Sequence, residues 1–353
     1  MTRIPSIDGL RCISIFLVIY GHSRFSDSIG IANLGVKVFF IISAYLIVGI
    51  LFKNVQNNNF SIKRFYFKRL IRTLPAFYTY LIFSTIFLMY INYFDFSQFW
   101  RSIIFLENYH PRGLWNNKQW FVGHSWSLAV EEQFYILVAI VFYLFNSKII
   151  NKKGLNRIFL LVIIIVPFIR IAYIYGQGII PSLFLESTGR SFETVSDALA
   201  IGGIIYLNQN KIQSSKIFNY FSNKIYLCII LILITLCLRS NFIPIDLKFK
   251  LRLVYYFFGE TIVNILIGLI ILITIKYHDK SYLARILNNH IIIYIGMLSY
   301  SIYLWQQIWL YNWNIHILFK YFGIIITATS SYYLIEKPFL RLRDKLIKDD
   351  KIK

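Results

Sequence analysis

The chain is poor in charged residues and in cysteine, and both shortages exclude large classes of protein. Only 15% of its 353 residues are charged, whereas 57% are hydrophobic, which is too little charge for an ordinary soluble domain. Its 3 cysteines are an odd number in apolar segments, so their spacing predicts neither a disulfide framework nor a zinc site: Cys12, Cys228 and Cys237. The sequence also lacks G-x-S-x-G, the P-loop, the dinucleotide fingerprint and H-E-x-x-H. We therefore expect a polytopic membrane protein rather than one of these soluble enzymes.

Acidic residues are scarce as well, since Lys and Arg outnumber Asp and Glu by 37 to 16. The resulting net charge of +21 suggests nucleic-acid binding at first sight. The basic residues, however, lie between long apolar runs rather than on one basic domain. Membrane topology explains them better, because cytosolic loops are enriched in Lys and Arg, and we expect no nucleic-acid partner.

Apolar windows of helical length predict an all-α fold with about ten transmembrane helices. The positive-inside rule places both termini in the cytosol. We expect one membrane-embedded domain over residues 1–340 and a basic cytosolic tail over residues 341–353. The windows are 9–24, 33–52, 76–93, 127–146, 157–176, 196–207, 224–239, 253–276, 291–312 and 316–335.

Ionisable residues interrupt the first predicted span, IDGLRCISIFLVIYGH, which runs from Ile7 to His22. If this stretch is a helix, the step from Arg11 to His22 advances about 16.5 Å and turns roughly 20° beyond three circles, so the two side chains share a face. Asp8 falls within about 40° of that face. We call the row of Asp8, Arg11 and His22 along one helix face the ionisable stripe. Ionisable side chains are costly in lipid, so this stripe should face a protein interior or a wet cavity. Alternatively, Arg11 snorkels to the cytosolic headgroups while His22 lies at the opposite interface.

A basic and aromatic segment, FSIKRFYFKRLIRTLP, precedes the third span. Arg69 and Arg72 are three residues apart and hence neighbours on a helix surface. The segment predicts either adhesion to anionic lipid or a grip on the phosphates of a cytosolic donor, for which Arg is well suited. These residues alone leave both roles open.

The segment HSWSLAVEEQFY opens the fourth span from the outer side. Spacing places His124, Ser127 and Glu131 near one helix face. A carboxylate at Glu131, level with His22, would orient an imidazole and raise its basicity, as general-base catalysis requires. The alternative is a helix start whose acidic residues favour the positive end of the dipole, which suits Glu132 better than Glu131. The spacing matches none of the usual metal-ligand patterns.

Four further segments carry polar residues or glycines in or near the spans. Lys37 is predicted to snorkel to the outer interface. Gly202 and Gly203 would permit close helix contact. Polar side chains within residues 299–310 should line an interior surface, and residues 335–345 are predicted to form a structural helix exit.

Seven motifs occur in order over nearly the whole chain: IDGLR with Arg11 and His22, GVKVFFIISAYLI, FYFKRLIRTLP, WSLAVEEQFY, SDALAIGG, SYSIYLW and EKPFLRLRDK. Together they resemble the membrane-bound acyltransferase 3 family, which includes bacterial O-acetyltransferases of cell-surface polysaccharides. The resemblance implies about ten helices in the bacterial inner membrane, with residues 1–340 as the acyltransferase domain. It also implies transfer of an acyl group, usually acetyl, from cytosolic acetyl-CoA to an outward-facing glycan hydroxyl.

The resemblance also implies roles for individual residues. Carried over by motif, His22 and Arg11 would be essential, and Glu131 would be a site residue. Arg69 and Arg72 would serve donor binding or a cytosolic gate. Roles do not carry over where this chain departs from many members, which have an acidic residue, Gly and His where it has Lys37, Ala44 and Gln306.

Some family members carry an appended extracytoplasmic esterase-like domain. This chain ends 15 residues after Pro338, so we expect no such domain here. We then expect the protein either to act alone on its acceptor or to pass the acyl group to a separate extracytoplasmic partner.

Our hypothesis from the sequence is acyl transfer from acetyl-CoA to a surface glycan or its lipid-linked precursor. His22 would be the general base or an acyl relay, supported by Glu131. Arg11 would neutralise the donor, and Arg69 with Arg72 would hold its phosphates. We expect no metal or redox cofactor, because thioester-to-ester transfer needs neither.

Two other functions compete with this hypothesis. In a transporter or flippase of a glycan intermediate, the same stripe would be a proton or substrate path. Transporters often show two matching halves, and we find no such internal match. An inactive scaffold is the other alternative. Donor consumption separates an enzyme from a flippase, because a flippase would not release free CoA.

Overall fold

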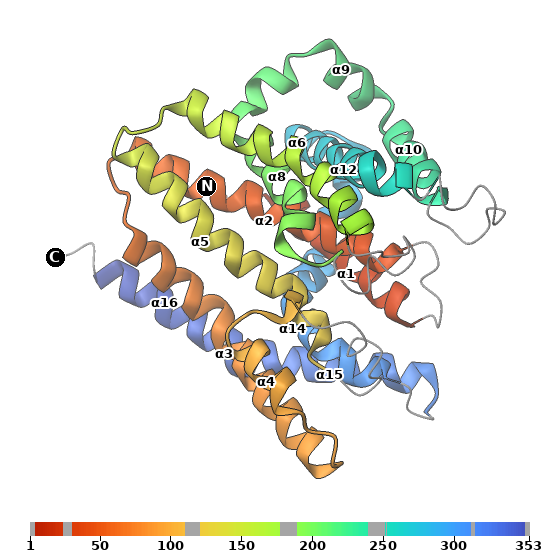
Figure 1. Ribbon diagram of the computed structural model, residues 1–353. Coiled ribbons are helices and arrows are strands. Elements are labelled where there is room, and N and C mark those ends of the chain that lie inside the picture. The colour runs from red at the N-terminus through yellow and green to blue at the C-terminus, as the bar shows by residue number, and fades with distance from the viewer. Residues whose placement is uncertain are drawn as a thin grey trace. The chain divides into compact units, whose positions relative to one another are not determined.

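The protein, seen here in a computed structural model, is built from helices, and no strand occurs in the part that the structure describes (Figure 1). The predicted all-α membrane fold is therefore confirmed. The residues described are 4–23, 30–109, 121–176, 189–238, 251, 253–311 and 315–349.

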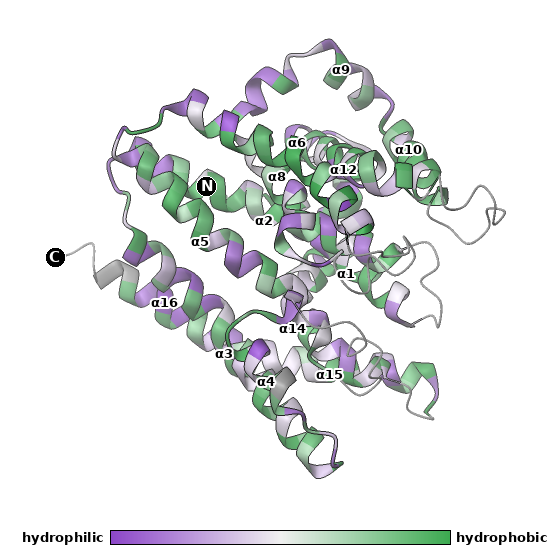
Figure 2. Ribbon diagram, viewed as in Figure 1, coloured by the Kyte–Doolittle hydropathy of each residue, from purple (hydrophilic) through white to green (hydrophobic). Residues whose placement is uncertain are grey.

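All ten predicted windows overlap helices, and seven of the described helices are long and apolar enough to cross a membrane, or up to eight if a bent pair counts as one span. Figure 2 shows long apolar stretches along α2, α6 and α12, whereas α16 is largely hydrophilic. The count of ten spans and the cytosolic termini stay predictions. The seven are Ile31–Gln56, Ile62–Tyr90, Gly123–Asn146, Lys152–Gly176, Tyr255–Lys276, His290–Leu310 and Ile317–Leu346.

The chain divides into two compact units, each formed from two segments. Unit 1 comprises residues 1–59 and 130–296, and unit 2 comprises residues 60–129 and 297–353. Helix α5 (Trp126–Asn146) begins in unit 2 and continues in unit 1, whereas α14 (His290–Leu310) begins in unit 1 and continues in unit 2.

The remaining helices divide cleanly between the units. Unit 1 holds α1 (Pro5–Ser23), α2 (Ile31–Gln56), α6 (Lys152–Gly176), α8 (Phe192–Gln213), α9 (Lys216–Asn223), α10 (Ile225–Cys237), the π-helical turn η4 (Tyr255–Gly259), α12 (Glu260–Lys276) and α13 (Tyr282–Leu287). Unit 2 holds α3 (Ile62–Tyr90), α4 (Phe96–Ile103), η1 (Glu107–Tyr109), η3 (Gly123–Ser125), α15 (Ile317–Ser331), η5 (Tyr332–Glu336) and α16 (Lys337–Asp349). Residues 341–349 of the predicted tail are thus helical.

Glycines bring α8 into close contact with two helices of unit 1 (Figure 1). A Cβ atom on Gly202 would overlap the backbone of α2 at the Ile41 carbonyl, and one on Gly203 would meet the ring of Phe159 on α6. Small residues permit this close approach of helix backbones. The predicted packing role of the glycine pair is confirmed.

The first helix, α1, packs on α2 through equally small residues. The Ser14 hydroxyl donates to the Gly35 carbonyl at 2.5 Å. A Cβ atom on Gly35 would overlap Ser14 and Val18, and one on Gly21 would overlap Ala32. These contacts fix the second half of α1 against the beginning of α2.

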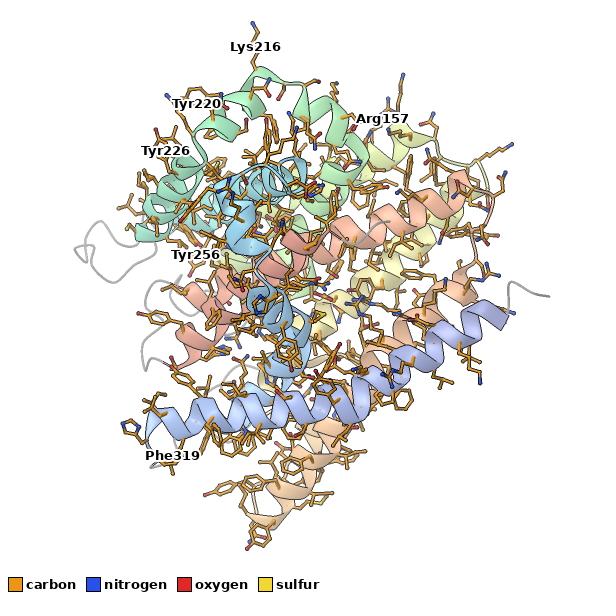
Figure 3. The ribbon with its side chains drawn as sticks, turned by 180° about the vertical axis from the view of Figure 1, so that it is seen from behind. Arg157, Lys216, Tyr220, Tyr226, Tyr256 and Phe319 are labelled. Atoms are coloured by element: carbon orange, nitrogen blue, oxygen red, sulfur yellow. The ribbon has the colours of Figure 1, made fainter. Side chains whose placement is uncertain are left out.

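A sharp bend of 89° separates α9 from α10. Lys276, at the end of α12, lies with its Nζ atom 4.8 Å from the ring of Phe218 and donates to the Gln213 carbonyl at 3.1 Å. Figure 3 shows Lys216 of α9 projecting away from the body of unit 1. The bent pair is therefore tied to α12 at one end.

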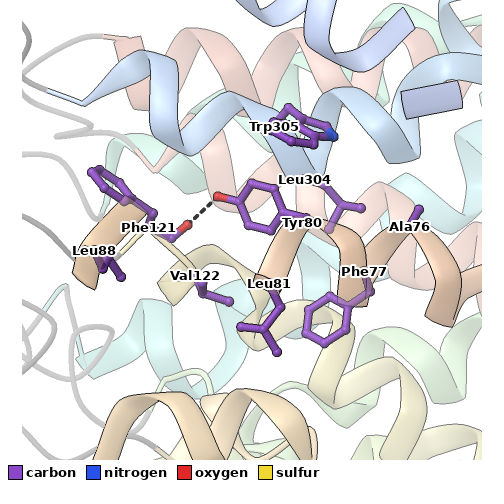
Figure 4. Packing of buried hydrophobic residues seen from close by; sticks show 9 residues of the cluster. All are labelled: Ala76, Phe77, Tyr80, Leu81, Leu88, Phe121, Val122, Leu304 and Trp305. Atoms are coloured by element: carbon purple, nitrogen blue, oxygen red, sulfur yellow. Dashed lines mark hydrogen bonds between the residues drawn. The ribbon is translucent and has the colours of Figure 1, made fainter. Parts of the chain in front are cut away.

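Unit 2 has its own apolar core, built from α3, residues 121–122 and α14 (Figure 4). The Tyr80 hydroxyl donates to the Phe121 carbonyl at 2.7 Å and so satisfies a polar group inside this core. On α14, Ser299, Ser301 and Gln306 are buried, which confirms the predicted interior polar surface. The core residues are Ala76, Phe77, Tyr80, Leu81, Leu88, Phe121, Val122, Leu304 and Trp305.

Candidate active site

The ionisable stripe predicted in the first span lies on one continuous helix, α1. Arg11 and His22 therefore share a face, about 16.5 Å apart along the helix axis. An ion pair of 3.6 Å joins Arg11 Nη1 to Asp8 Oδ1, one turn away. Asp8 is buried, Arg11 is half-buried and His22 is exposed, so the stripe runs from a covered end to an open one.

The covered end of the stripe is held by close packing within unit 1. Gly296 lies so near the Asp8 carbonyl that a Cβ atom there would overlap it. The Ser6 hydroxyl donates to Asn288 Oδ1 at 2.7 Å. The backbone that carries Asp8 and Arg11 is thereby fixed.

Glu131, the predicted supporting carboxylate, is held by two hydroxyl groups of unit 1. Its Oε2 atom accepts from the Tyr135 hydroxyl at 2.6 Å and from the Ser43 hydroxyl at 3.2 Å. These two hydroxyl oxygens lie 2.6 Å apart. Glu131 and His22 belong to the same unit, and a direct role of the carboxylate toward the imidazole stays a prediction.

The sequence reasoning missed both hydroxyl partners of Glu131. Tyr135 lies one helical turn after Glu131, so an i, i+4 rule applied to α5 would have found it. Ser43 comes from α2, 88 residues away, and no local spacing points to it.

His124 and Ser127, predicted near the face of Glu131, have their own partners in unit 2. The His124 ring is buried with its centre 5.6 Å from that of Tyr80 and 5.2 Å from that of Tyr303. The Tyr303 hydroxyl donates to the His124 carbonyl at 2.5 Å and lies 2.7 Å from Ser127 Oγ. Tyr303 therefore fixes the residues that lead into α5.

The predicted donor-binding pair, Arg69 and Arg72, lies on α3 in unit 2. Arg69 is half-buried and Arg72 is exposed. Glu336, the last residue of η5, is buried and accepts a hydrogen bond from the Ser301 hydroxyl. α16, which follows Glu336 directly, packs beside α3 (Figure 1). The segment predicted to be a structural helix exit thus begins with a buried carboxyl group that is hydrogen-bonded to α14 and continues as a helix beside α3.

The prediction that Lys37 snorkels to the outer interface is wrong. Its side chain is only 13% exposed and forms an ion pair with Glu260, the first residue of α12. An opposite charge within the unit compensates for lost hydration, so the ammonium group stays between helices.

The described residues contain no group of three or more His, Cys, Asp or Glu side chains arranged to hold a metal ion. Cys12 and Cys228 are buried thiols on different helices of unit 1. The described part of the chain therefore presents its ionisable groups as pairs rather than as a ligand cluster.

A family profile described as an acyltransferase domain matches residues 4–335. The peptidoglycan O-acetyltransferase OatA of Listeria monocytogenes is 28% identical over 330 residues, which cover 86% of this chain and 49% of OatA. YrhL of Bacillus subtilis, provisionally named a peptidoglycan O-acetyltransferase, is 26% identical over 378 residues, covering 95% of this chain and 54% of YrhL.

A third relative, a Staphylococcus aureus protein provisionally named an O-acetyltransferase, is 27% identical over 375 residues, covering 96% of this chain and 58% of that protein. The chain spans about half the length of the curated relatives it matches. No solved structure matches the chain.

Proposed function

The chain belongs to the membrane-bound acyltransferase 3 family, and from that premise we propose that it is a membrane O-acetyltransferase. The proposed donor is acetyl-CoA on the cytosolic side. The proposed acceptor is a hydroxyl group of a cell-surface glycan or of its lipid-linked precursor, outside the bacterial cytoplasmic membrane. The names of OatA and YrhL support O-acetyl transfer to a cell-wall glycan as the class of reaction.

The observation that carries this proposal is the stripe on α1. One helix places Arg11 and His22 on one face, about 16.5 Å apart along its axis. An anion-binding group at one level and an acid–base group at the other suit a transfer that begins on one side of a membrane and ends on the other.

In direct transfer, the acceptor hydroxyl oxygen attacks the acetyl carbonyl carbon while the His22 imidazole takes the hydroxyl proton. The carbon–sulfur bond breaks, and the imidazolium returns the proton to the departing thiolate. In the covalent route, the imidazole nitrogen attacks the acetyl carbon, the carbon–sulfur bond breaks, and the departing CoA thiolate takes the imidazole proton. The acceptor hydroxyl oxygen then attacks the acetyl-imidazole, the nitrogen–acetyl bond breaks, and the hydroxyl proton returns to the imidazole. Glu131 stabilises the positively charged ring in either route.

The donor is held by cationic side chains. Arg69 and Arg72 present adjacent guanidinium groups that suit bidentate contacts with phosphate oxygens. Arg11 neutralises negative charge as the acyl-bearing arm enters the bundle, and Asp8 keeps its guanidinium oriented. The ion pair between Asp8 and Arg11 supports this last role.

The test is base-labile acetate on the purified surface glycan of a host that lacks the gene, complemented at matched membrane levels. Wild type should restore the acetate, whereas His22→Ala and Arg11→Ala should not. Matched controls are His290→Ala and Arg157→Ala, which remove an exposed His and an exposed Arg elsewhere in unit 1. Full restoration by His22→Ala would overturn the catalytic assignment.

A second measurement separates acyl transfer from transport. Purified protein given acetyl-CoA and a glycan acceptor should release CoA and acetylate the glycan in equal amounts. Acceptor acetylation only after adding an extracytoplasmic fraction would instead indicate a separate partner. Glycan export without CoA release would favour the transporter.

A further inference from the structure

Four charged side chains in unit 1 form two buried ion pairs that the sequence reasoning did not connect. Lys37 on α2 pairs with Glu260 on α12. Arg170 on α6 pairs with Asp197 on α8 through an Nη2 to Oδ1 distance of 2.7 Å. Four helices therefore each contribute one charge, and the charges cancel.

Thr261, the residue next to Glu260, hydrogen-bonds to both members of the Arg170–Asp197 pair, so the backbone between residues 260 and 261 connects the two pairs. Its hydroxyl donates to Asp197 Oδ2 at 2.6 Å and accepts from Arg170 Nη1 at 3.0 Å. Arg170 Nε donates to the Thr194 carbonyl at 2.8 Å. We call Lys37, Glu260, Thr261, Arg170, Asp197 and Thr194 the ionic network.

The ionic network is too enclosed and too well paired to be a ligand site. The Arg170 and Asp197 side chains are 3% and 0% exposed, and the Glu260 side chain is 9% exposed. A buried pair contributes little net stability, because desolvation opposes the attraction, but it fixes which groups face each other.

Lys37 lies on the part of α2 that supports the His22 end of α1. Ala32 and Gly35, five and two residues before Lys37, are the positions where α2 contacts Gly21 and Val18 of α1. Gly21 is the neighbour of His22, and five residues of helix span only about 7.5 Å.

The partner helix of Lys37 also reaches α1. α12 packs against both α1 and α2. Glu260 is its first residue and follows the π-helical turn η4, and such turns are often found at functional sites. The Lys37–Glu260 pair thus joins α2 to α12, and both of these helices pack against α1.

We propose that the Lys37–Glu260 ion pair is a positioning element of the acyl-transfer site, which sets the place of His22 by locking α2 to α12. This inference rests on the proposed function for its catalytic consequence, but its positional consequence can be measured without any activity. Through Thr261 and the Arg170–Asp197 pair, the ionic network also connects α6 and α8 to α12.

The positional test labels a cysteine beside His22. Ser23→Cys is introduced after Cys12, Cys228 and Cys237 are replaced, and its reaction with a maleimide is timed on purified protein in detergent. Lys37→Met should change the rate by at least about threefold, because a loosened helix end opens more often. Lys320→Met, which removes a buried lysine from unit 2, should leave the rate unchanged.

The catalytic test is charge reversal. Lys37→Glu and Glu260→Lys should each lower kcat by about 100-fold, since a misplacement of about 1 Å costs that much, with a smaller change in KM. The double reversal should be more active than the two single effects together predict, and the size of this difference measures the coupling between Lys37 and Glu260.

The outcomes separate the two proposals. An unchanged labelling rate in Lys37→Met overturns the positioning role, whatever the enzyme does. A changed rate together with no acetyl transfer by wild type supports the positioning of α1 and overturns the proposed function. Single reversals that reduce only the amount of folded protein, with normal turnover per molecule, also overturn the positioning role.

Discussion

Two groups of ionisable side chains in unit 1, the ionic network and the stripe on α1, differ in how far they are buried. In the ionic network, every charge lies between helices against an opposite charge, as in the Arg170–Asp197 pair. On α1, Asp8 lies beside Arg11 at the covered end of the helix, and His22 at the other end is exposed.

This difference in burial indicates which ionisable groups are placed to take part in a reaction. A buried pair must keep both charges, because either one alone would be stranded in a poorly polarisable interior. An exposed imidazole can be reached by an acceptor hydroxyl group, which is what a general base requires. We therefore propose a positioning role for the ionic network and a catalytic role for the α1 stripe, and the variants below test this division.

The largest expected effect is on the reactive side of this contrast. His22→Ala should reduce acetyl transfer per molecule by about 100- to 10,000-fold, the range for removing a general base. Its unfolding free energy should change by only about 0.5 kcal/mol, as for other exposed positions. Acetate release from purified glycan and thermal unfolding in detergent measure the two quantities. If the unfolding free energy of His22→Ala fell enough to account for its loss of activity, the catalytic role of His22 would be contradicted.

The second prediction addresses the structural side. Arg170→Met leaves the Asp197 carboxylate buried without its partner and should lower the unfolding free energy by about 3–5 kcal/mol. Replacing both residues, as Arg170→Met with Asp197→Leu, should recover part of this loss, because no charge is then stranded. Thermal unfolding of the purified proteins measures both.

A surface pair provides the control for the Arg170 prediction. Arg343 and Asp344 on α16 pair at 2.6 Å, with the Asp344 side chain 60% exposed. Arg343→Met should cost at most about 1 kcal/mol. Equal losses from Arg343→Met and Arg170→Met would show that burial does not determine the cost.

Helix-based features of the molecule could be predicted from the sequence because helical geometry is local. A rise of about 1.5 Å and a turn of about 100° per residue suffice to place Arg11 and His22 on one face. The same rule places the glycine pair of α8 at a contact. The hydrophobic windows predicted the helices because apolar runs of that length leave few alternatives.

Contacts between distant segments could not be predicted in this way. Lys37 resembles a snorkelling lysine until Glu260 is brought against it by the fold. Arg170 and Thr261 are 91 residues apart, and nothing in either segment indicates the other. Such pairs depend on which helix faces pack, which a periodicity argument leaves open.

The third prediction concerns the close packing of α8 against α2, two helices of the ionic network. Gly202→Leu should force α8 away from α2 and lower the unfolding free energy by about 1–3 kcal/mol, because the added side chain overlaps the Ile41 carbonyl. Gly176→Leu is the matched control, since a Cβ atom there meets nothing within 4 Å. Thermal unfolding of both variants decides the matter, and equal stability would mean that α8 can shift without cost.

The smallest expected effect concerns the Glu131 carboxylate. Ser43→Ala removes one hydroxyl from Glu131 and leaves the 2.6 Å bond from Tyr135 in place. Loss of one such bond should cost about 1 kcal/mol, and turnover should fall by roughly fivefold if Glu131 must be oriented to support His22. Ser331→Ala is the control, because Ser331 Oγ is buried without a hydrogen-bond partner among the described residues.

The value of Ser43→Ala is that it distinguishes orientation from mere presence of the carboxylate. Tyr135 and Ser43 both reach Oε2, so removing Ser43 lets the carboxylate turn while its charge stays. If Glu131 acts only through its charge, turnover should not change while stability falls slightly. A drop in kcat with unchanged KM would mean instead that Glu131 belongs with the α1 stripe, as a group held ready for reaction.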